Sequence, residues 1–201
     1  AELFEALASL YRRQGRAAEA VALLRRGVEL RPKDEALRYV LGAAYERDGE
    51  VERSLEEMRQ VLSLNPDHAA ALNFIGYTLA ENRRDSRDLE EAERLLNRAL
   101  QLRPDTGAFL DSLGWVYFRR GDYGRAVETL ERAAALAPDE PQIIEHLGDA
   151  YHQAQRTGPA AEAYQQALEA LSSAPDAADA ADLSAKREAL ERKLKTLSND
   201  P

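Results

Sequence analysis

The chain has 201 residues, of which 44% are hydrophobic and 31% charged, so it can form one domain or one short repeat array with a buried core. Its 36 acidic and 27 basic side chains give a formal charge of −9, which disfavours binding to nucleic acid and to anionic membrane surfaces. The absence of cysteine excludes disulfides, thiol nucleophiles and cysteine-ligated zinc.

No apolar run approaches the roughly 18 residues that a membrane-spanning helix needs, and no signal peptide pattern is visible. We therefore expect no membrane span. Arginine and alanine are abundant and lysine is scarce, which indicates a GC-rich bacterial source. The composition leaves the compartment open between bacterial cytoplasm and periplasm.

Three residue types recur along the chain with one shared period. Both the prolines and the glycines are separated by 34, 38 and 34 residues, and tyrosine follows the same spacing with Leu79 in the middle position. The repeated residues are Pro32, Pro66, Pro104 and Pro138, then Gly42, Gly76, Gly114 and Gly148, then Tyr11, Tyr45, Tyr117 and Tyr151. This pattern predicts an internal structural repeat.

The period divides the chain into repeat units, and each unit contains two amphipathic helical patterns with a short break between them. The third unit carries four extra residues near positions 82–87. We expect five units at 1–34, 35–68, 69–106, 107–140 and 141–172, followed by a linker and a C-terminal capping helix at 173–201.

The ends of the helices can also be predicted. Each repeated proline should end the second helix of its unit. The aspartates that follow are candidate N-caps of the next helix, namely Asp34, Asp67, Asp105 and Asp139. Asp88 and Glu91 form a capping-box pattern, which predicts that the four extra residues lie in a turn.

The repeated glycines lie inside predicted helices, where glycine costs about 1 kcal/mol relative to alanine. A glycine at such a position indicates that two helices approach closely. Small residues on the second helices would face them, namely Ala20, Ser54, Ala92, Ala126 and Ala160.

A 34-residue helix–turn–helix unit with the pattern L-G-x-x-Y, alanine and then proline resembles the tetratricopeptide repeat (TPR) family. Leu41-Gly42 with Tyr45, Leu113-Gly114 with Tyr117, and Leu147-Gly148 with Tyr151 carry this resemblance. It implies an all-α, right-handed solenoid of about five TPR hairpins plus a C-terminal capping helix. It also implies a concave groove lined by the first helix of each unit.

The two ends differ from the middle. In the last segment Leu183, Leu190, Leu194 and Leu197 share one helical face, which favours a capping helix; the alternative is a free amphipathic helix that binds a partner. At the other end Phe4, Leu7 and Leu10 have no preceding helix to cover them. This suggests either a fragment of a longer array, which the missing initial methionine would fit, or a true first repeat that has lost a leader.

The inner face of the groove should carry the partner-binding residues, and aromatic side chains with nearby arginines are typical of interface hot spots. The alternative is that some of these aromatics pack against neighbouring repeats. The candidates are Tyr39 and Arg47; Asn73 and Tyr77; Asp111, Trp115, Phe118 and Arg119; and Glu145, His146, Asp149 and His152.

No catalytic constellation is visible, since the chain lacks a phosphate-binding loop and a nucleophile elbow. His146, Asp149 and His152 could bind zinc in principle, but their three-residue steps drift around a helix, so we expect no metal site and no cofactor.

We therefore expect a non-enzymatic scaffold that binds a protein or peptide in its groove. The alternatives are a structural array that assembles with itself through its open ends, and a targeting or regulatory domain of a larger enzyme or of an envelope, secretion or pilus assembly factor. TPR domains that bind acidic chaperone tails use inner-face lysines and asparagines, and Glu5, Ser9 and Tyr39 stand in those positions here, so we expect no heat-shock chaperone partner.

Overall fold

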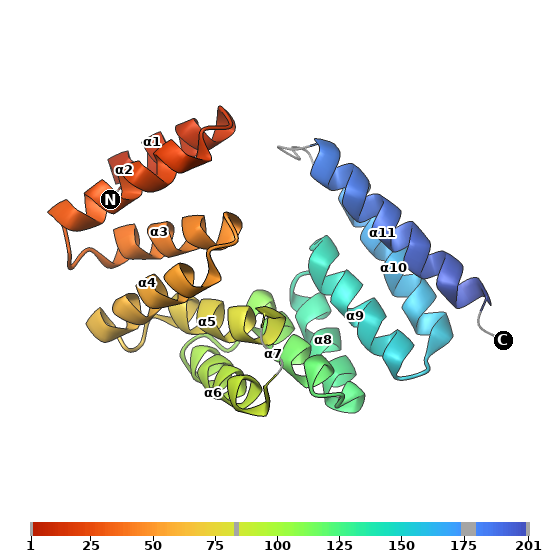
Figure 1. Cartoon of the computed structure of the whole chain (residues 1–201). Coiled ribbons are helices and arrows are strands. Elements are labelled where there is room, and N and C mark those ends of the chain that lie inside the picture. Colours follow the sequence, from red (N-terminus) through yellow and green to blue (C-terminus); the bar gives the residue numbers. More distant parts are fainter. Residues whose placement is uncertain (1, 83–84, 174–179, 200–201) are drawn as a thin grey trace.

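The computed structural model describes residues 2–82, 85–173 and 180–199, and these residues form eleven α-helices and no strand. The helices are α1 (Glu2–Arg13), α2 (Ala17–Leu30), α3 (Glu35–Arg47), α4 (Val51–Leu64), α5 (Ala69–Asn82), α6 (Ser86–Leu102), α7 (Gly107–Arg119), α8 (Tyr123–Leu136), α9 (Pro141–Gln153), α10 (Thr157–Ser173) and α11 (Ala180–Asn199). Consecutive helices pair and the pairs stack in chain order into a curved arch, with α1 and α11 at its two ends (Figure 1). The predicted helical solenoid is confirmed.

The predicted close approach of the helices at the four repeated glycines is confirmed, but the prediction that small residues face them is wrong, since the nearest side chains are Met58, Leu96, Leu130 and Tyr164. A Cβ atom added at Gly114 would lie 2.6 Å from Leu130 Cγ, and one at Gly148 would lie 2.5 Å from Tyr164 Cε1. The same crowding occurs at Gly42 and Gly76. Glycine is therefore retained in these helices because any side chain would push the second helix away.

A second set of glycines allows the turn within a hairpin. Gly15, Gly49 and Gly121 follow the first helices of their units with φ of 73°, 76° and 77°, the left-handed conformation that glycine adopts without steric cost. In the fifth unit Gln155 holds this position with φ of 60°. A side chain with a Cβ is strained there.

The helix caps follow a different register from the one predicted. Asp34 caps α3 as expected, accepting a hydrogen bond of 3.1 Å from the Leu37 amide. The other three predictions are wrong, since Asp67, Asp105 and Asp139 lie one residue too early. The cap is always the second residue after the proline, and it is His68, Thr106 or Glu140 in the later units.

The prediction that the extra residues of the third unit lie in a turn is wrong. The cap of α6 is Asp85, which accepts a hydrogen bond of 2.8 Å from the Arg87 amide, so Asp88 already lies in the first turn. α6 has 17 residues against 14 in α4 and α8, and α5 has 14 against 13 in α3 and α7. The three additional residues of α6 and the one of α5 account for the four extra residues of the third unit. Positions 83–84 of the predicted turn lie outside the described residues.

The C-terminal helix α11 covers α10, as predicted for a capping helix. Leu190 and Leu197 are 0% and 4% exposed and pack in one core cluster with Ile144 and Tyr164. The predicted linker begins later than expected, because α10 continues to Ser173, and the rest of the linker lies outside the described residues. The C-terminal end of the stack is therefore closed by apolar packing.

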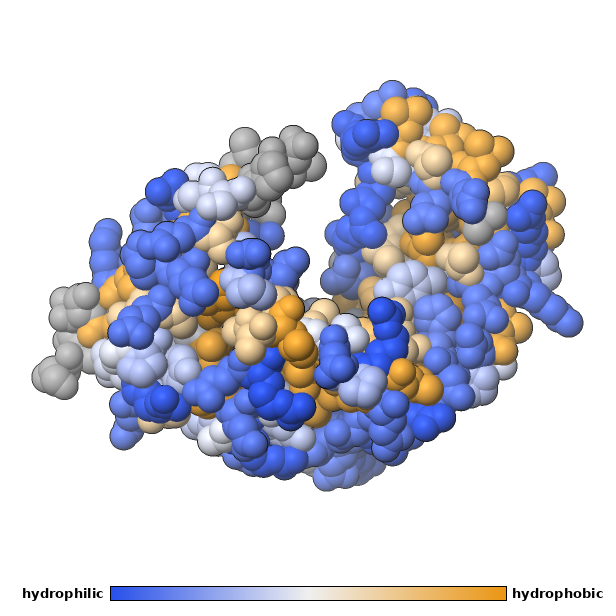
Figure 2. All heavy atoms as spheres, turned by 180° about the vertical axis from the view of Figure 1, so that it is seen from behind, coloured by the Kyte–Doolittle hydropathy of each residue, from blue (hydrophilic) through white to orange (hydrophobic). Residues whose placement is uncertain are grey.

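The N-terminal end is open. Leu3, Leu7 and Leu10 of α1 are 79%, 36% and 42% exposed. The residues 34 positions further along, in α3, are Leu37, Leu41 and Ala44, which are 0%, 1% and 4% exposed. Apolar atoms gather over this end of the molecule in Figure 2.

The expectation that Phe4 is also uncovered is wrong. Its ring packs inside the first hairpin, where a Cβ at Gly27 would lie 3.0 Å from Phe4 Cδ1. Phe4 therefore belongs to the interior of the first unit and not to the open face.

Candidate partner-binding groove

The inner side of the arch is hollowed between its N-terminal and C-terminal parts (Figure 2). A cavity of about 540 Å³ lies where the first helices of units three to five meet the C-terminal helices. Its lining residues are Tyr77 and Glu81 of α5, Trp115 of α7, Glu140 before α9, Pro141, Gln142, Glu145, His146 and Asp149 of α9, Leu171 of α10, and Lys186 and Lys193 of α11.

A second cavity of about 420 Å³ adjoins the first. The two share Tyr77, Glu140 and Gln142, and the second adds Asn73 and Asp111. The Tyr77 hydroxyl accepts a hydrogen bond of 3.1 Å from Gln142 Nε2, which links α5 to the start of α9 across the boundary of the cavities. We call these two neighbouring cavities together the groove site.

Trp115 connects three repeat units in the floor of the groove site. Its indole stacks on Phe118 with ring centroids 4.6 Å apart and on His146 of the next unit at 4.2 Å. Its Nε1 donates a hydrogen bond of 2.7 Å to Glu81 Oε2 of the preceding unit. The ring faces and the N–H of Trp115 are therefore engaged within the protein, and what it offers to a ligand is its remaining edge.

His146 and Asp111 form a buried polar pair beside this stack. The two side chains belong to α9 and α7, His146 Nδ1 lies 2.8 Å from Asp111 Oδ1, and the residues are 8% and 6% exposed. Burial lowers the pKa of His146, but the hydrogen bond and the charge of Asp111, with the charges of Asp149 and Glu145, raise it by more, so that the net pKa lies above 6.5.

The region around Tyr77 is electrostatically negative. Burial raises the pKa of Tyr77 to about 12, and the nearby charges of Glu81 and Asp111 add to this increase. The phenol is therefore neutral at ordinary pH and acts in the groove site as a hydrogen-bonding group with an apolar ring.

The C-terminal helix supplies a cation to the groove site. Lys193 of α11 donates hydrogen bonds of 2.7 Å to Glu145 Oε1 and 2.8 Å to Asp149 Oδ2, both on α9. Asp149 also accepts a hydrogen bond of 2.8 Å from the Tyr164 hydroxyl. Burial lowers the pKa of Lys193, and Asp149 and Glu145 raise it by more, so Lys193 is charged and holds α11 against the inner face.

Some of the predicted binding residues line the groove site and others do not. Seven of the twelve line one or both cavities: Asn73, Tyr77, Asp111, Trp115, Glu145, His146 and Asp149. The other five lie outside this lining: Tyr39, Arg47, Phe118, Arg119 and His152.

The five residues outside the lining have identifiable places. Tyr39 stacks on His68 with ring centroids 5.5 Å apart, and Arg119 lies 3.7 Å from Glu81 in an ion pair. Phe118 belongs to the Trp115 stack. Arg47 is exposed in the last turn of α3, and His152 is half-buried near the end of α9.

Sequence reasoning missed Glu140, Gln142 and the two lysines of α11. Gln142 lies three residues before Glu145, so one helical turn back along the same face would have included it. No spacing in the sequence indicates the two lysines, because their distance from the groove depends on how α11 packs.

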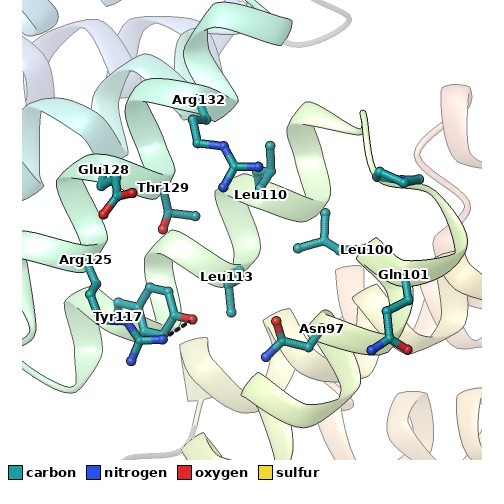
Figure 3. Close-up of a pocket in the computed structure, with 11 residues that line it drawn as sticks. Asn97, Leu100, Gln101, Leu110, Leu113, Tyr117, Arg125, Glu128, Thr129 and Arg132 are labelled. Atoms are coloured by element: carbon teal, nitrogen blue, oxygen red, sulfur yellow. Dashed lines mark hydrogen bonds between the residues drawn. The ribbon is translucent and has the colours of Figure 1, made fainter.

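A third cavity, of about 530 Å³, lies away from the groove between α6, α7 and α8 (Figure 3). There the Arg125 guanidinium lies 3.9 Å from the centroid of the Tyr117 ring and donates a hydrogen bond of 2.7 Å to its hydroxyl. Glu128 and Arg132 stand at its rim. Arg125 and Tyr117 already pair within their hairpin, and this cavity is a gap between α6 and the α7–α8 hairpin.

In the part of the chain that the structure describes, no group of three or more histidine, aspartate or glutamate residues could hold a metal ion. The former zinc candidates bind protein groups instead: His146 pairs with Asp111, and Asp149 with Lys193. The same described part contains no helix with the length and apolar character needed to cross a bilayer.

Stacked helical hairpins with a lined inner groove define the class of helical repeat scaffolds. Family models described as tetratricopeptide repeat match residues 11–76, 49–105, 77–141 and 112–175. The chain therefore belongs to the tetratricopeptide repeat family, a fold that implies a protein-interaction scaffold.

Solved structures agree on the fold. A thermophilic TPR protein of Thermus thermophilus has a TM-score of 0.76 at 24% identity, covering 95% of this chain and 98% of its own. PilW, a widely conserved type IV pilus biogenesis factor, has a TM-score of 0.75 at 20% identity, covering 98% of both chains. MamA of Desulfovibrio magneticus has a TM-score of 0.68 at 22% identity, covering 87% of this chain and 97% of its own. No curated protein matches the sequence.

Proposed function

We propose that this protein is a non-catalytic scaffold that binds a segment of a partner protein in the groove site. The supporting observation is the composition of that site: three consecutive repeat units and α11 contribute aromatic side chains, amides and charged groups to two neighbouring cavities. Concave sites with a few convergent polar groups on an aromatic wall are typical of ligand recognition. Heat-shock chaperone tails and nucleic acid are not expected ligands, since carboxylates line the site.

A partner in envelope or pilus assembly is a natural candidate, because PilW is a pilus biogenesis factor of similar fold. PilW is only 20% identical to this chain, so the two proteins share the scaffold and not a set of binding residues.

Site-directed photocrosslinking tests the proposed function. A photoreactive amino acid replaces Gln142, which is exposed and lines both cavities, and the same amino acid replaces Glu128, which is exposed and lines neither, as a control. In lysate of the source organism we expect a discrete protein adduct at position 142 and none at position 128. Equal labelling at both positions would reject binding in the groove.

A second candidate function is self-assembly through the α1 face, defined by Leu3, Leu7 and Leu10. The observation that favours it is the exposure of these side chains at positions that are buried in the second unit. Because α11 packs over the apolar face of α10, that face is used within the chain, and pairing would bring two α1 faces together.

A further inference from the structure

The charge on the lining of the larger cavity is unbalanced. Four carboxylates line it, from Glu81, Glu140, Glu145 and Asp149, against the two ammonium groups of Lys186 and Lys193. Glu81 also pairs with Arg119 outside the lining, so one negative charge is in excess before the buried His146–Asp111 pair is considered. An incoming carboxylate would meet like charges here, whereas an incoming cation would not.

Glu140 is the carboxylate best placed to receive a cation. It is exposed, lines both cavities, and stands at the N-cap position of α9 without making a capping hydrogen bond from its side chain. Among the described residues no side chain pairs with it, whereas Glu145 and Asp149 share Lys193. One negative group is thus left uncompensated where the cavities meet.

The hydrogen-bonding groups of the site point to the same ligand. Two donors of the site are used within the protein, since Trp115 Nε1 donates to Glu81 and Gln142 Nε2 donates to Tyr77. An acceptor is left over, because Asn73 Oδ1 is buried beside the second cavity without a hydrogen-bond partner. A buried acceptor without a donor is costly, so a ligand N–H group is favoured there if side-chain movement opens the second cavity to Asn73 Oδ1.

The walls of the groove site suit a long side chain. Tyr77 and Trp115 line the same cavity as Glu140. Lysine and arginine bury their aliphatic stems along such apolar surface while the charged head reaches a carboxylate.

We propose, on the basis of the proposed function, that the groove site takes an extended partner segment through a lysine or arginine side chain whose charged head binds Glu140. Charge complementarity selects a basic segment over an acidic one.

The single tryptophan of the chain gives a direct assay. Trp115 lies in the site, so its fluorescence reports binding by the wild-type protein. The probes are a short alanine-based peptide with arginine at alternate positions and two matched peptides with glutamine or glutamate in place of arginine. We expect saturable fluorescence change with the arginine peptide, weaker binding with added salt, and little change with the other two.

The variant Glu140→Gln keeps the shape of the side chain and removes its charge. We expect it to weaken binding of the arginine peptide by about three- to tenfold, the effect of one charged hydrogen bond. Glu128→Gln, which removes a charge at the rim of the cavity in Figure 3, should leave the affinity unchanged. Circular dichroism melting checks that both variants fold.

The outcomes separate this inference from the proposed function. Preference for the glutamine or glutamate peptide, or equal loss of affinity in both variants, would overturn the basic-segment inference while leaving a groove that binds protein. No binding by any peptide would also overturn it, and crosslinking at position 142 would then decide the proposed function independently.

Discussion

His146 Nδ1 of α9 lies 2.8 Å from Asp111 Oδ1 of α7, and this pair joins the fourth and fifth units in a place from which water is largely excluded. The pair also holds the imidazole flat against Trp115. Replacing either partner of such a buried pair lowers the stability of the fold, because the other partner is left buried without a hydrogen bond.

This pair should make stability depend on pH. The folded-state pKa of His146 lies above the ordinary value of 6.5, so its contribution is complete below that value and is lost as the pH rises through the folded-state pKa. We expect Asp111→Asn to lower the free energy of unfolding by about 2 kcal/mol in mildly acidic buffer and by less at higher pH. Urea titrations of both proteins across this range measure the difference; a difference independent of pH would contradict this role of Asp111.

Gly114→Ala should destabilise the fourth hairpin, because the new methyl group would lie 2.6 Å from Leu130 Cγ. Overpacking of this kind costs about 1–3 kcal/mol. Gly158→Ala is the matched control, since nothing lies within 4 Å of a Cβ at that helical position. Thermal melting should show a lower Tm for the first variant and an unchanged or slightly higher Tm for the second; equal effects would exclude close packing as the cause.

Gln155→Gly should stabilise the protein. Gln155 adopts φ of 60° at the position where Gly15, Gly49 and Gly121 allow the turn in other units. Relief of this left-handed strain is worth about 1 kcal/mol. Chemical denaturation should show a higher midpoint for the variant, whereas Gln153→Gly, at the last residue of α9, should not raise it. A lower midpoint for Gln155→Gly would show that the Gln155 side chain stabilises the fold by more than the backbone strain destabilises it.

Trp115→Ala should reduce stability as well as alter the groove site, because the indole stacks on Phe118 and His146 and bonds Glu81. Loss of a large aromatic side chain costs about 3 kcal/mol where the site cannot collapse. Trp115→Phe keeps a stacking ring and should lose about 1 kcal/mol, for the hydrogen bond. Urea unfolding followed by circular dichroism measures both. Unchanged stability in Trp115→Ala would mean that the stack does not hold the units together.

The α1 face can be tested by sedimentation velocity. If it mediates self-assembly, the sedimentation coefficient of the wild-type protein should rise with concentration, and the triple substitution of Leu3, Leu7 and Leu10 by serine should abolish the rise. Leu3 is 79% exposed, so its own substitution should change the free energy of unfolding by less than about 0.5 kcal/mol. A wild-type protein that stays monomeric at every concentration would reject this candidate function.

Much of the fold follows from the sequence alone. Gly114 and Gly148 indicated where helices touch, and Pro32 and Pro104 indicated where they end, because helix formation and helix pairing within 34 residues are set by local spacing. The errors were also local. Asp67 lies one residue before the cap, and the extra residues of the third unit lengthen its two helices, because helix propensity does not fix a helix end to the exact residue.

The composition of the groove site was decided by the tertiary structure. Gln142 bonds Tyr77 across 65 residues of sequence, and Lys193 bonds Glu145 across 48. Periodicity places a residue on the inner face of its own helix, but the curvature of the stack determines which inner faces meet, and the packing of α11 on α10 determines which cations reach them. Each of these depends on small rotations between whole hairpins, summed over many side-chain contacts, and no single spacing in the sequence encodes that sum.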